Sequence, residues 1–269
     1  MASESSIGII GSGWLGLPLA GAIQKQFHPE QLLLSYRSES TREQIVSANF
    51  KAGHLDIDDL SQADSGFFGV DTLIINIPSK SLIGFEALVS RIQVSKVTRI
   101  LFVSSTSVYN PSPDLVTEET LTNDSPLAQI ERHLITCGKP LTIIRPGGLI
   151  GGNRHPGRFF KRTGLIPNPD LPVNLIHRDD VIGAILMLLG KEQGCPVEIV
   201  NLVASSHPSR GELYLKASQS VGNELICDEH SDKQSYKCIS NEKLTNELGY
   251  RMIFPDLLKL LEVSDAFTP

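Results

Sequence analysis

The first half of this 269-residue sequence alternates short apolar runs with segments of helical periodicity. Apolar runs bounded by turn residues predict β-strands over 7–10, 31–36, 71–77, 99–105 and 141–145. Between them, the spacing of apolar residues predicts helices over 14–26, 41–48, 80–94 and 125–137. Continuous apolar strands separated by helices are typical of a parallel sheet covered on both faces. The sequence therefore predicts an α/β fold with a Rossmann-type, doubly wound parallel sheet.

The second half of the chain is less regular and is rich in Gly and Pro between its apolar runs. A helix is predicted over 179–190 and a strand over 197–203. We expect a Rossmann core over 1–148, to which 174–203 returns. A small C-terminal α/β substrate lobe over 149–269 is expected to be intertwined with that core.

Composition limits the classes of partner. The formal net charge of −6 gives no basic footprint for nucleic acid, and no apolar stretch reaches the roughly 18 residues needed to span a bilayer. The four cysteines form no CxxC pair, and the N-terminal residues show no secretory signal. We expect a cytoplasmic protein, a monomer or homodimer, that binds a small-molecule substrate but neither nucleic acid nor membrane.

The motif GSGWLG lies between the first predicted strand and the first predicted helix. In this context Gly11 permits a tight turn, Gly13 lets the backbone approach a pyrophosphate, and Gly16 allows close packing of helix and sheet. The phosphates would lie at the helix N-terminus, where N–H groups and the helix dipole favour an anion. The alternative is that the glycines serve only a turn. We predict a dinucleotide site that also includes Trp14 and Leu15.

The residues after the second predicted strand indicate which dinucleotide binds. Many NAD sites place an acidic residue about 20 positions beyond the glycines, but here the sequence reads SYRSESTR, with Arg37 at that place. The planar guanidinium of Arg37 suits the 2′-phosphate of NADP, so we expect NADP (or NAD) as the cofactor, with NADP preferred. The alternative is that Arg37 is a solvated surface charge. The predicted cofactor site also contains neighbours of Arg37 and residues near later strand ends: Tyr36, Ser38, Asp56, Asn76, Ile77, Pro78, Ser104, Arg145 and Pro146.

Two resemblances follow from these motifs. IGIIGSGWLGLPLA resembles the N-terminus of the β-hydroxyacid dehydrogenases, but those enzymes continue into a mostly helical second domain and this chain does not. A resemblance over most of residues 5–256 is to the extended and atypical short-chain dehydrogenases, the NAD-dependent epimerase/dehydratase superfamily. FVSSTSVYN resembles their SSxxVYG segment, IIRPGGLIGG their RPxxxYGP segment, and VNLIHRDDVIGAI their IHVDDLA segment. GGNRHPGRFF, SSHPSR and NELGY add a resemblance to the YeeZ-like branch.

The resemblance implies oxidoreductase or epimerase-like chemistry, with Ser105 holding the substrate and Tyr109 as a second candidate catalytic residue. The family's acid–base dyad, YxxxK, is absent, because the matching stretch SPLAQIE has Leu127 and Glu131 in place of Tyr and Lys. An unassisted Tyr is a poor acid–base group near pH 7. The alternatives are that Ser105 only satisfies backbone groups, and that the chain is a non-catalytic NADP-binding sensor or regulator. If it is an enzyme, rebuilding the dyad with Leu127→Tyr and Glu131→Lys is expected to raise turnover.

A basic loop follows the IIRPGG segment in this otherwise acidic chain. The sequence GGNRHPGRFFKR contains Arg154 and Arg158, with Lys161 and Arg162 beyond them. These cations suit a phosphorylated or nucleotide-sugar-like substrate, although a solvated face is the alternative. We include Ser107 and His177 in the predicted substrate site, while His177 is also a candidate structural hydrogen-bonding residue. No spacing of His, Cys, Asp or Glu indicates a metal site.

Overall fold

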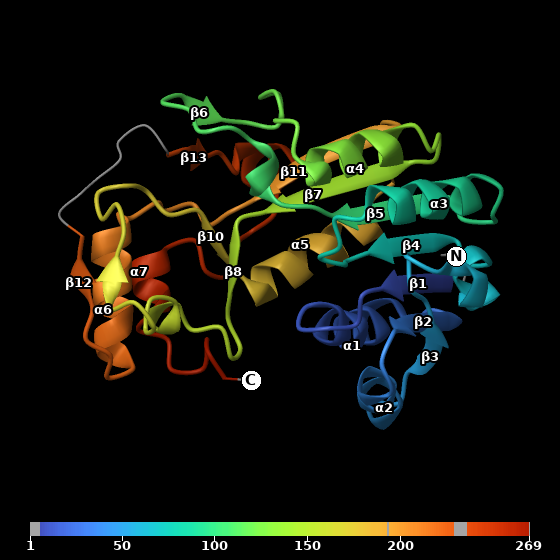
Figure 1. The fold of residues 1–269 in the computed structure, drawn as a ribbon, viewed down its shortest axis with the longest axis horizontal. Coiled ribbons are helices and arrows are strands. Elements are labelled where there is room, and N and C mark those ends of the chain that lie inside the picture. The colour runs from blue at the N-terminus through green and yellow to red at the C-terminus, as the bar shows by residue number, and fades with distance from the viewer. Residues whose placement is uncertain (1–5, 193, 229–235, 269) are drawn as a thin grey trace. The chain divides into compact units, whose positions relative to one another are not determined.

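The protein is described by a computed structural model that covers residues 6–192, 194–228 and 236–268. Its central sheet has seven strands in the order β11-β7-β5-β4-β1-β2-β3, and neighbouring strands from β3 to β7 pair in parallel (Figure 1). The strands are β1 (Ser6–Ile10), β2 (Gln31–Tyr36), β3 (Lys51–His54), β4 (Thr72–Ile75), β5 (Arg99–Val103), β7 (Leu141–Pro146) and β11 (Val197–Leu202). The strand order reverses between β1 and β4, which is the topological switch point of a doubly wound sheet. The predicted fold class is confirmed.

Helices cover both faces of this sheet. They are α1 (Gly16–Phe27), α2 (Glu39–Ser47), α3 (Leu82–Gln93), α4 (Pro126–Ile135) and α5 (Arg178–Gly190). Helices α3 and α4 pack side by side on one face, with α1 on the other (Figure 1). Three of these helices begin after a serine whose hydroxyl accepts a hydrogen bond from a first-turn backbone N–H: Ser38 for α2, Ser81 for α3 and Ser125 for α4.

The core beneath α3 and α4 explains why the strands read as continuous apolar runs. Phe85 of α3 meets Phe102 of β5 edge to face, with ring centroids 5.8 Å apart. Ile130 of α4, Ile75 of β4 and Ile143 of β7 are fully buried in the same cluster. A parallel strand in mid-sheet is covered on both faces, so its side chains are apolar in both directions.

The chain forms two compact units, each made of three separate segments. The first unit comprises Met1–Val108, Asn123–Arg145 and Ile185–Ile199, and the second comprises Tyr109–Thr122, Pro146–Ala184 and Val200–Pro269. Our sequence-based division placed 1–148 and 174–203 in the core. The structure groups residues 109–122 with the second unit instead, and the last return to the first unit covers only 185–199.

The described part of the second unit contains short paired strands, the first half of α5 and two further α-helices. The strand pairs are β8 (Gly148–Ile150) with β10 (Leu175–His177), β9 (Leu165–Ile166) with β12 (Ile226–Cys227), and β6 (Leu115–Val116) with β13 (Cys238–Ile239). Helices α6 (Arg210–Ser220) and α7 (Leu257–Leu260) close a core that includes Ile150, Ile166, Leu213, Leu257 and Leu260. Among the described residues, no helix is both long and apolar enough to cross a bilayer.

Candidate functional site

The loop between β1 and α1 is held tightly against the neighbouring strand end. Gly11 has a φ of 105°, and a Cβ there would overlap the carbonyl oxygen of Asn76. A Cβ on Gly16 would overlap the carbonyl oxygen of Gly11. The Asn76 side chain donates to the Gly11 carbonyl at 3.2 Å, and the Gly11 N–H donates to the Ser35 hydroxyl at 2.8 Å. The first and third glycines of the motif are therefore required by the chain's own packing.

The second glycine has a different environment. A Cβ on Gly13 would meet no described atom within 4 Å, and the residue is exposed. The adjacent Ser12 is only 5% exposed, and its hydroxyl has no hydrogen-bond partner among the described residues. Leu15, which precedes α1, cannot cap that helix with its side chain. The loop thus combines open space, a buried hydroxyl and a helix start without a side-chain cap, which together fit a bound phosphate.

The predicted 2′-phosphate site after β2 is accessible. The Arg37 side chain is 68% exposed. Its guanidinium makes only a long ion pair among the described residues, with Asp56 at 3.9 Å. Asp56 accepts a hydrogen bond from the Asp58 N–H at 3.1 Å, which is the geometry of a turn. Tyr36 is half-buried, and the Ser38 hydroxyl caps α2. Arg37 is placed where an added anion could reach it.

The remaining residues near the predicted cofactor site differ in exposure. Trp14 is half-buried and Leu15 is buried under the loop. Ile77 packs against the core beneath α3, while Pro78 is exposed. Pro146 is buried as the last residue of β7. Their assignment to cofactor binding stays a prediction.

A buried polar cluster lies at the carboxyl ends of β5 and β7. The Ser104 hydroxyl lies 2.5 Å from Glu131 Oε1, and the Arg145 guanidinium donates to both oxygens of Glu131, from Nε at 3.1 Å and from its terminal nitrogen at 2.6 Å. Glu131 is 2% exposed, Arg145 3% and Ser104 8%. Bidentate pairing with a guanidinium is the strongest way to hold a buried carboxylate.

This cluster was not predicted from the sequence. We interpreted Glu131 only as a residue standing where relatives have Lys, and Arg145 as a cofactor contact. The structure shows that the two charges neutralise each other. Leu127, where relatives have Tyr, packs against the core beneath α3 and α4. The buried pair argues against the expectation that Leu127→Tyr with Glu131→Lys raises turnover, because a lysine at position 131 would face Arg145 in a buried site.

The hydroxyl groups of the SSTSVY segment are largely used within the chain. The Ser105 hydroxyl accepts a hydrogen bond from the Ser107 N–H at 3.1 Å, and Ser107 is exposed. Tyr109 is 1% exposed, and its hydroxyl donates to the Asn201 side-chain oxygen at 2.8 Å. Ser105 and Ser107 retain access to a ligand, whereas Tyr109 is a core residue of the second unit.

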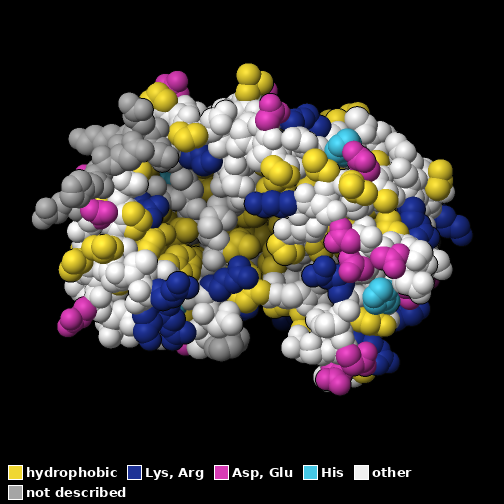
Figure 2. Space-filling model, in the orientation of Figure 1, with side chains coloured by type: hydrophobic (Ala, Val, Ile, Leu, Met, Phe, Trp, Pro, Cys, Tyr) yellow, Lys and Arg dark blue, Asp and Glu magenta, His cyan; other side chains and the backbone are white. Residues whose placement is uncertain are grey.

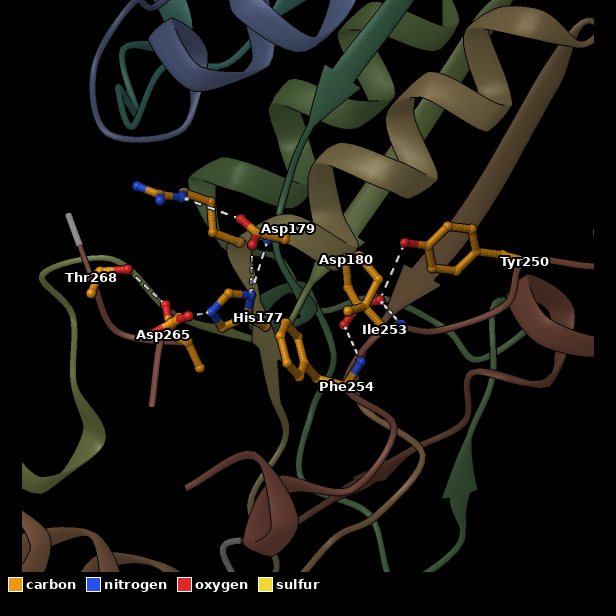
Figure 3. Close-up of polar contacts among 10 residues, drawn as sticks. His177, Asp179, Asp180, Tyr250, Ile253, Phe254, Asp265 and Thr268 are labelled. Carbon is orange, nitrogen blue, oxygen red and sulfur yellow. Dashed lines mark hydrogen bonds and ion pairs between the residues drawn. The ribbon is translucent and has the colours of Figure 1, made fainter. Parts of the chain in front are cut away.

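His177 in the second unit is buried, and both of its ring nitrogens are used (Figure 3). Nε2 lies 2.7 Å from the Ala266 carbonyl, and Nδ1 accepts from the Asp179 N–H at 3.2 Å. These partners assign the neutral Nε2–H tautomer. The ring also meets Phe254 edge to face at 4.4 Å. The geometry supports the structural alternative for His177 over a substrate contact.

The next acidic residue, Asp180, joins the start of α5 to the C-terminal segment (Figure 3). Its carboxylate is fully buried and accepts from the Ile253 N–H at 2.7 Å, the Phe254 N–H at 3.0 Å and the Tyr250 hydroxyl at 3.2 Å. Burial raises the pKa of Asp180, and these three donors offset part of that rise. The HRDD motif thus fixes the path of the chain rather than forming a metal site. Among the described residues, no group of three or more His, Cys, Asp or Glu is placed to hold a metal ion.

The basic loop after β8 is ordered around a buried histidine. His155 Nδ1 accepts from the Gly157 N–H at 3.1 Å, and burial, together with the charge of Arg158, lowers the pKa of His155. Phe160 packs edge-on against Tyr214 of α6, with centroids 4.9 Å apart. Figure 2 shows Lys and Arg side chains gathered over this part of the second unit. The exposed cations of the loop are Arg154, Arg158, Lys161 and Arg162.

Solved structures share this fold over nearly the whole chain. A putative NAD-dependent epimerase/dehydratase from Methylobacillus flagellatus has a TM-score of 0.77 and 22% identity, covering 96% of both chains. UDP-glucuronic acid 4-epimerase from Bacillus cereus, in complex with UDP-glucuronic acid and NAD, has a TM-score of 0.76 and 16% identity, also covering 96% of both chains. A short-chain dehydrogenase/reductase superfamily protein from Agrobacterium tumefaciens with bound NAD has a TM-score of 0.78 and 16% identity, covering 96% of this chain and 95% of that one. The fold is that of the short-chain dehydrogenase and epimerase/dehydratase proteins.

Sequence comparison gives the narrower assignment. No family model matches the chain. The protein YeeZ of Escherichia coli strain K12 is 32% identical over 278 aligned residues, which cover 94% of this chain and 97% of YeeZ. The chain belongs to the YeeZ family.

Proposed function

We propose that the chain binds a nicotinamide dinucleotide at the loop between β1 and α1, prefers NADP(H), and catalyses oxidoreductase or epimerase-like chemistry on a small anionic or nucleotide-sugar-like ligand. The observation that carries this proposal is the contrast among the three motif glycines. Gly11 and Gly16 are required by the chain's own packing, whereas Gly13 faces open space beside the buried Ser12 hydroxyl. A pyrophosphate fits that space. The nicotinamide would supply the hydride-transfer chemistry when bound.

Consecutive strand ends of the first unit support a path for the proposed ligand. Gly11, Asn76 and Ser104 directly follow β1, β4 and β5, and Arg145 is the penultimate residue of β7; these strands are neighbours in the sheet. Strands lie about 4.8 Å apart, so Ser104 is roughly 10 Å along the edge from the glycine loop. In open α/β sheets, ligands bind outside the carboxyl ends of the strands at the switch point. The chain's own residues would thus hold phosphates at β1 and present polar groups to the nicotinamide end at β5.

The glycine contrast gives a direct test. Gly13→Ala is expected to leave Tm unchanged, because its methyl group meets no described atom, and to weaken NADP+ binding at least about tenfold, or 1.4 kcal/mol, by filling the phosphate space. Gly16→Ala is the matched comparison and should lower Tm, because its methyl group overlaps the Gly11 carbonyl. Isothermal titration calorimetry and thermal melts measure both. Unchanged affinity in a stable Gly13→Ala protein would exclude this loop as the phosphate site.

Cofactor preference is tested at Arg37. The wild type is expected to bind NADP+ several-fold more tightly than NAD+, and Arg37→Ala to abolish that difference, because the exposed guanidinium pairs with the 2′-phosphate. Arg42→Ala is the control, since Arg42 is exposed on α2 and is already paired with Glu39. Titrations of both cofactors at two salt concentrations should show the preference falling as screening rises. Equal affinities in the wild type would overturn the NADP assignment.

The second candidate function is a non-catalytic NADP-binding sensor. It is favoured by Leu127 and Glu131, which replace the acid–base dyad and are both used in packing or charge pairing. Tyr109 cannot replace the missing Tyr without leaving the core, so we propose a structural role for it. Ser105 and Ser107 remain the candidates to orient a substrate carbonyl or hydroxyl. Tight NADPH binding without NADPH oxidation by any carbonyl substrate would favour the sensor over the enzyme.

A further inference from the structure

We propose that Glu131 is a positioning residue that turns the Ser104 hydroxyl into a fixed hydrogen-bond acceptor for the carboxamide N–H of a bound nicotinamide. The inference rests on the proposed function, since it concerns the nicotinamide end of the same dinucleotide site. It assigns a role to the carboxylate that stands where short-chain dehydrogenase relatives carry the lysine of their dyad.

The hydrogen bonds within the cluster determine which atom donates. Glu131 Oε1 lies near two groups, the Ser104 hydroxyl and Arg145 Nε, and Oε2 accepts from the terminal Arg145 nitrogen. Arginine has only donors, so the carboxylate is acceptor-only in this arrangement. The hydrogen between Ser104 and Glu131 therefore belongs to Ser104. With that hydrogen used, the Ser104 oxygen has only lone pairs left to offer.

The burial of the cluster keeps the Ser104 hydroxyl hydrogen directed at Glu131, so that Ser104 remains an acceptor. Glu131 and Arg145 are almost completely shielded from water, and separating them would leave a buried charge unpaired. A serine hydroxyl on the surface rotates to suit its ligand, but Ser104 would lose a charge-assisted hydrogen bond by rotating. Its backbone N–H is also fixed, donating to the Ile144 carbonyl of β7 at 2.7 Å.

The position of Ser104 favours the cofactor over the substrate as the donor. Ser104 is 8% exposed at the end of β5, whereas Ser105 is half-buried and Ser107 is exposed. The deepest of the three hydroxyls lies closest to the strand ends, along which a dinucleotide extends. A nicotinamide carboxamide offers two N–H donors there. A carboxylate in its place would face the lone pairs of Ser104 and is expected to be disfavoured.

The test compares cofactors that differ only in this group. NADP+ carries the carboxamide, and nicotinic acid adenine dinucleotide phosphate carries a carboxylate. Trp14, the one tryptophan in the chain, lies in the glycine loop and reports binding of either compound by its fluorescence, independently of activity. The wild type is expected to bind NADP+ at least about tenfold more tightly than the acid, a difference of 1.4 kcal/mol.

Three variants separate the possible causes of that preference. Glu131→Gln keeps the shape but removes the charge, so the hydrogen bond that fixes the Ser104 hydrogen is no longer charge-assisted and the preference should fall to a few-fold or less. Ser104→Ala keeps the Glu131–Arg145 pair and should also lose the preference. Glu86→Gln is the matched control on α3, where the carboxylate is exposed, and should retain the wild-type ratio.

Each outcome has a defined meaning. A preference that survives in Ser104→Ala but is lost in Glu131→Gln would show direct charge repulsion by Glu131 and would overturn positioning through Ser104. Equal binding of the two compounds by the wild type would also overturn it while leaving the proposed function intact. Binding of neither compound would overturn the proposed function together with this inference. If Glu131→Gln does not fold, Ser104→Ala, which leaves the buried ion pair in place, still tests whether the preference acts through Ser104, and a retained preference would overturn the inference.

Discussion

Glu131→Lys is expected to lower the free energy of unfolding by at least about 4 kcal/mol, and Tm by roughly 10 °C. Glu131 is buried against the Arg145 guanidinium, so the substitution replaces attraction by repulsion between two buried cations. The Ser104 hydroxyl also loses its acceptor. Thermal and urea unfolding of the purified variant measure the effect.

A second substitution isolates the cause. Adding Arg145→Ala to the Glu131→Lys variant removes the opposing cation and should recover part of the lost stability. The two sites are in contact, so their effects are not additive. Leu127→Tyr alone should change stability much less, since Leu127 is only partly buried. A Glu131→Lys protein as stable as the wild type would contradict the buried pair. It would also restore the expectation that the YxxxK dyad can simply be rebuilt.

Asp180→Ala is expected to destabilise the protein by about 3 kcal/mol. The carboxylate accepts two backbone hydrogen bonds and one from Tyr250, so its removal leaves buried donors without a partner (Figure 3). The segment carrying Ile253 and Phe254 would lose its anchor, and Phe254 its fixed contact with His177. Hydrogen exchange at the Ile253 and Phe254 amides should accelerate along with the fall in Tm.

The neighbouring carboxylate provides the control for this effect. Asp179 is half-exposed, and its closest charged neighbour among the described residues is Arg178, at 3.7 Å; the neutral His177 ring lies 3.8 Å away. Asp179→Ala is therefore expected to cost less than about 1 kcal/mol. Similar losses for the two variants would mean that charge near the start of α5, rather than the buried hydrogen bonds of Asp180, stabilises the segment.

The regular elements of the first unit could be predicted because their local patterns agree with their tertiary burial. β2 is buried over its four central residues, and β7 is buried throughout, as expected for parallel strands covered on both faces. By contrast, the two- and three-residue strands of the second unit are too short to show any periodicity. Their pairing, such as β6 with β13, joins segments more than 100 residues apart.

The candidate site was predictable only where the signal is local. The glycine loop is contiguous in sequence, and its spacing alone indicates a phosphate site. The Glu131 cluster joins a helix to two strand ends, so its members are separated by 27 and 14 residues. The sequence marks only one of the two charges as unusual: Arg145 ends the apolar run LTIIR, whereas Glu131 lies in the polar stretch QIERH and looks like an ordinary surface residue. A charge at the end of a buried strand needs a partner, but nothing local indicates that this partner is Glu131.

The alternation of the chain between the two units also limits how relatives of this protein can exchange parts. Each unit has three segments, and the six segments alternate along the chain, so the chain passes between units five times. A single genetic crossover cannot transfer one complete unit to a homologue, and one proteolytic cut cannot release it. New ligand specificity in this architecture is therefore expected to arise by substitutions within loops such as 151–164, rather than by exchange of a whole domain.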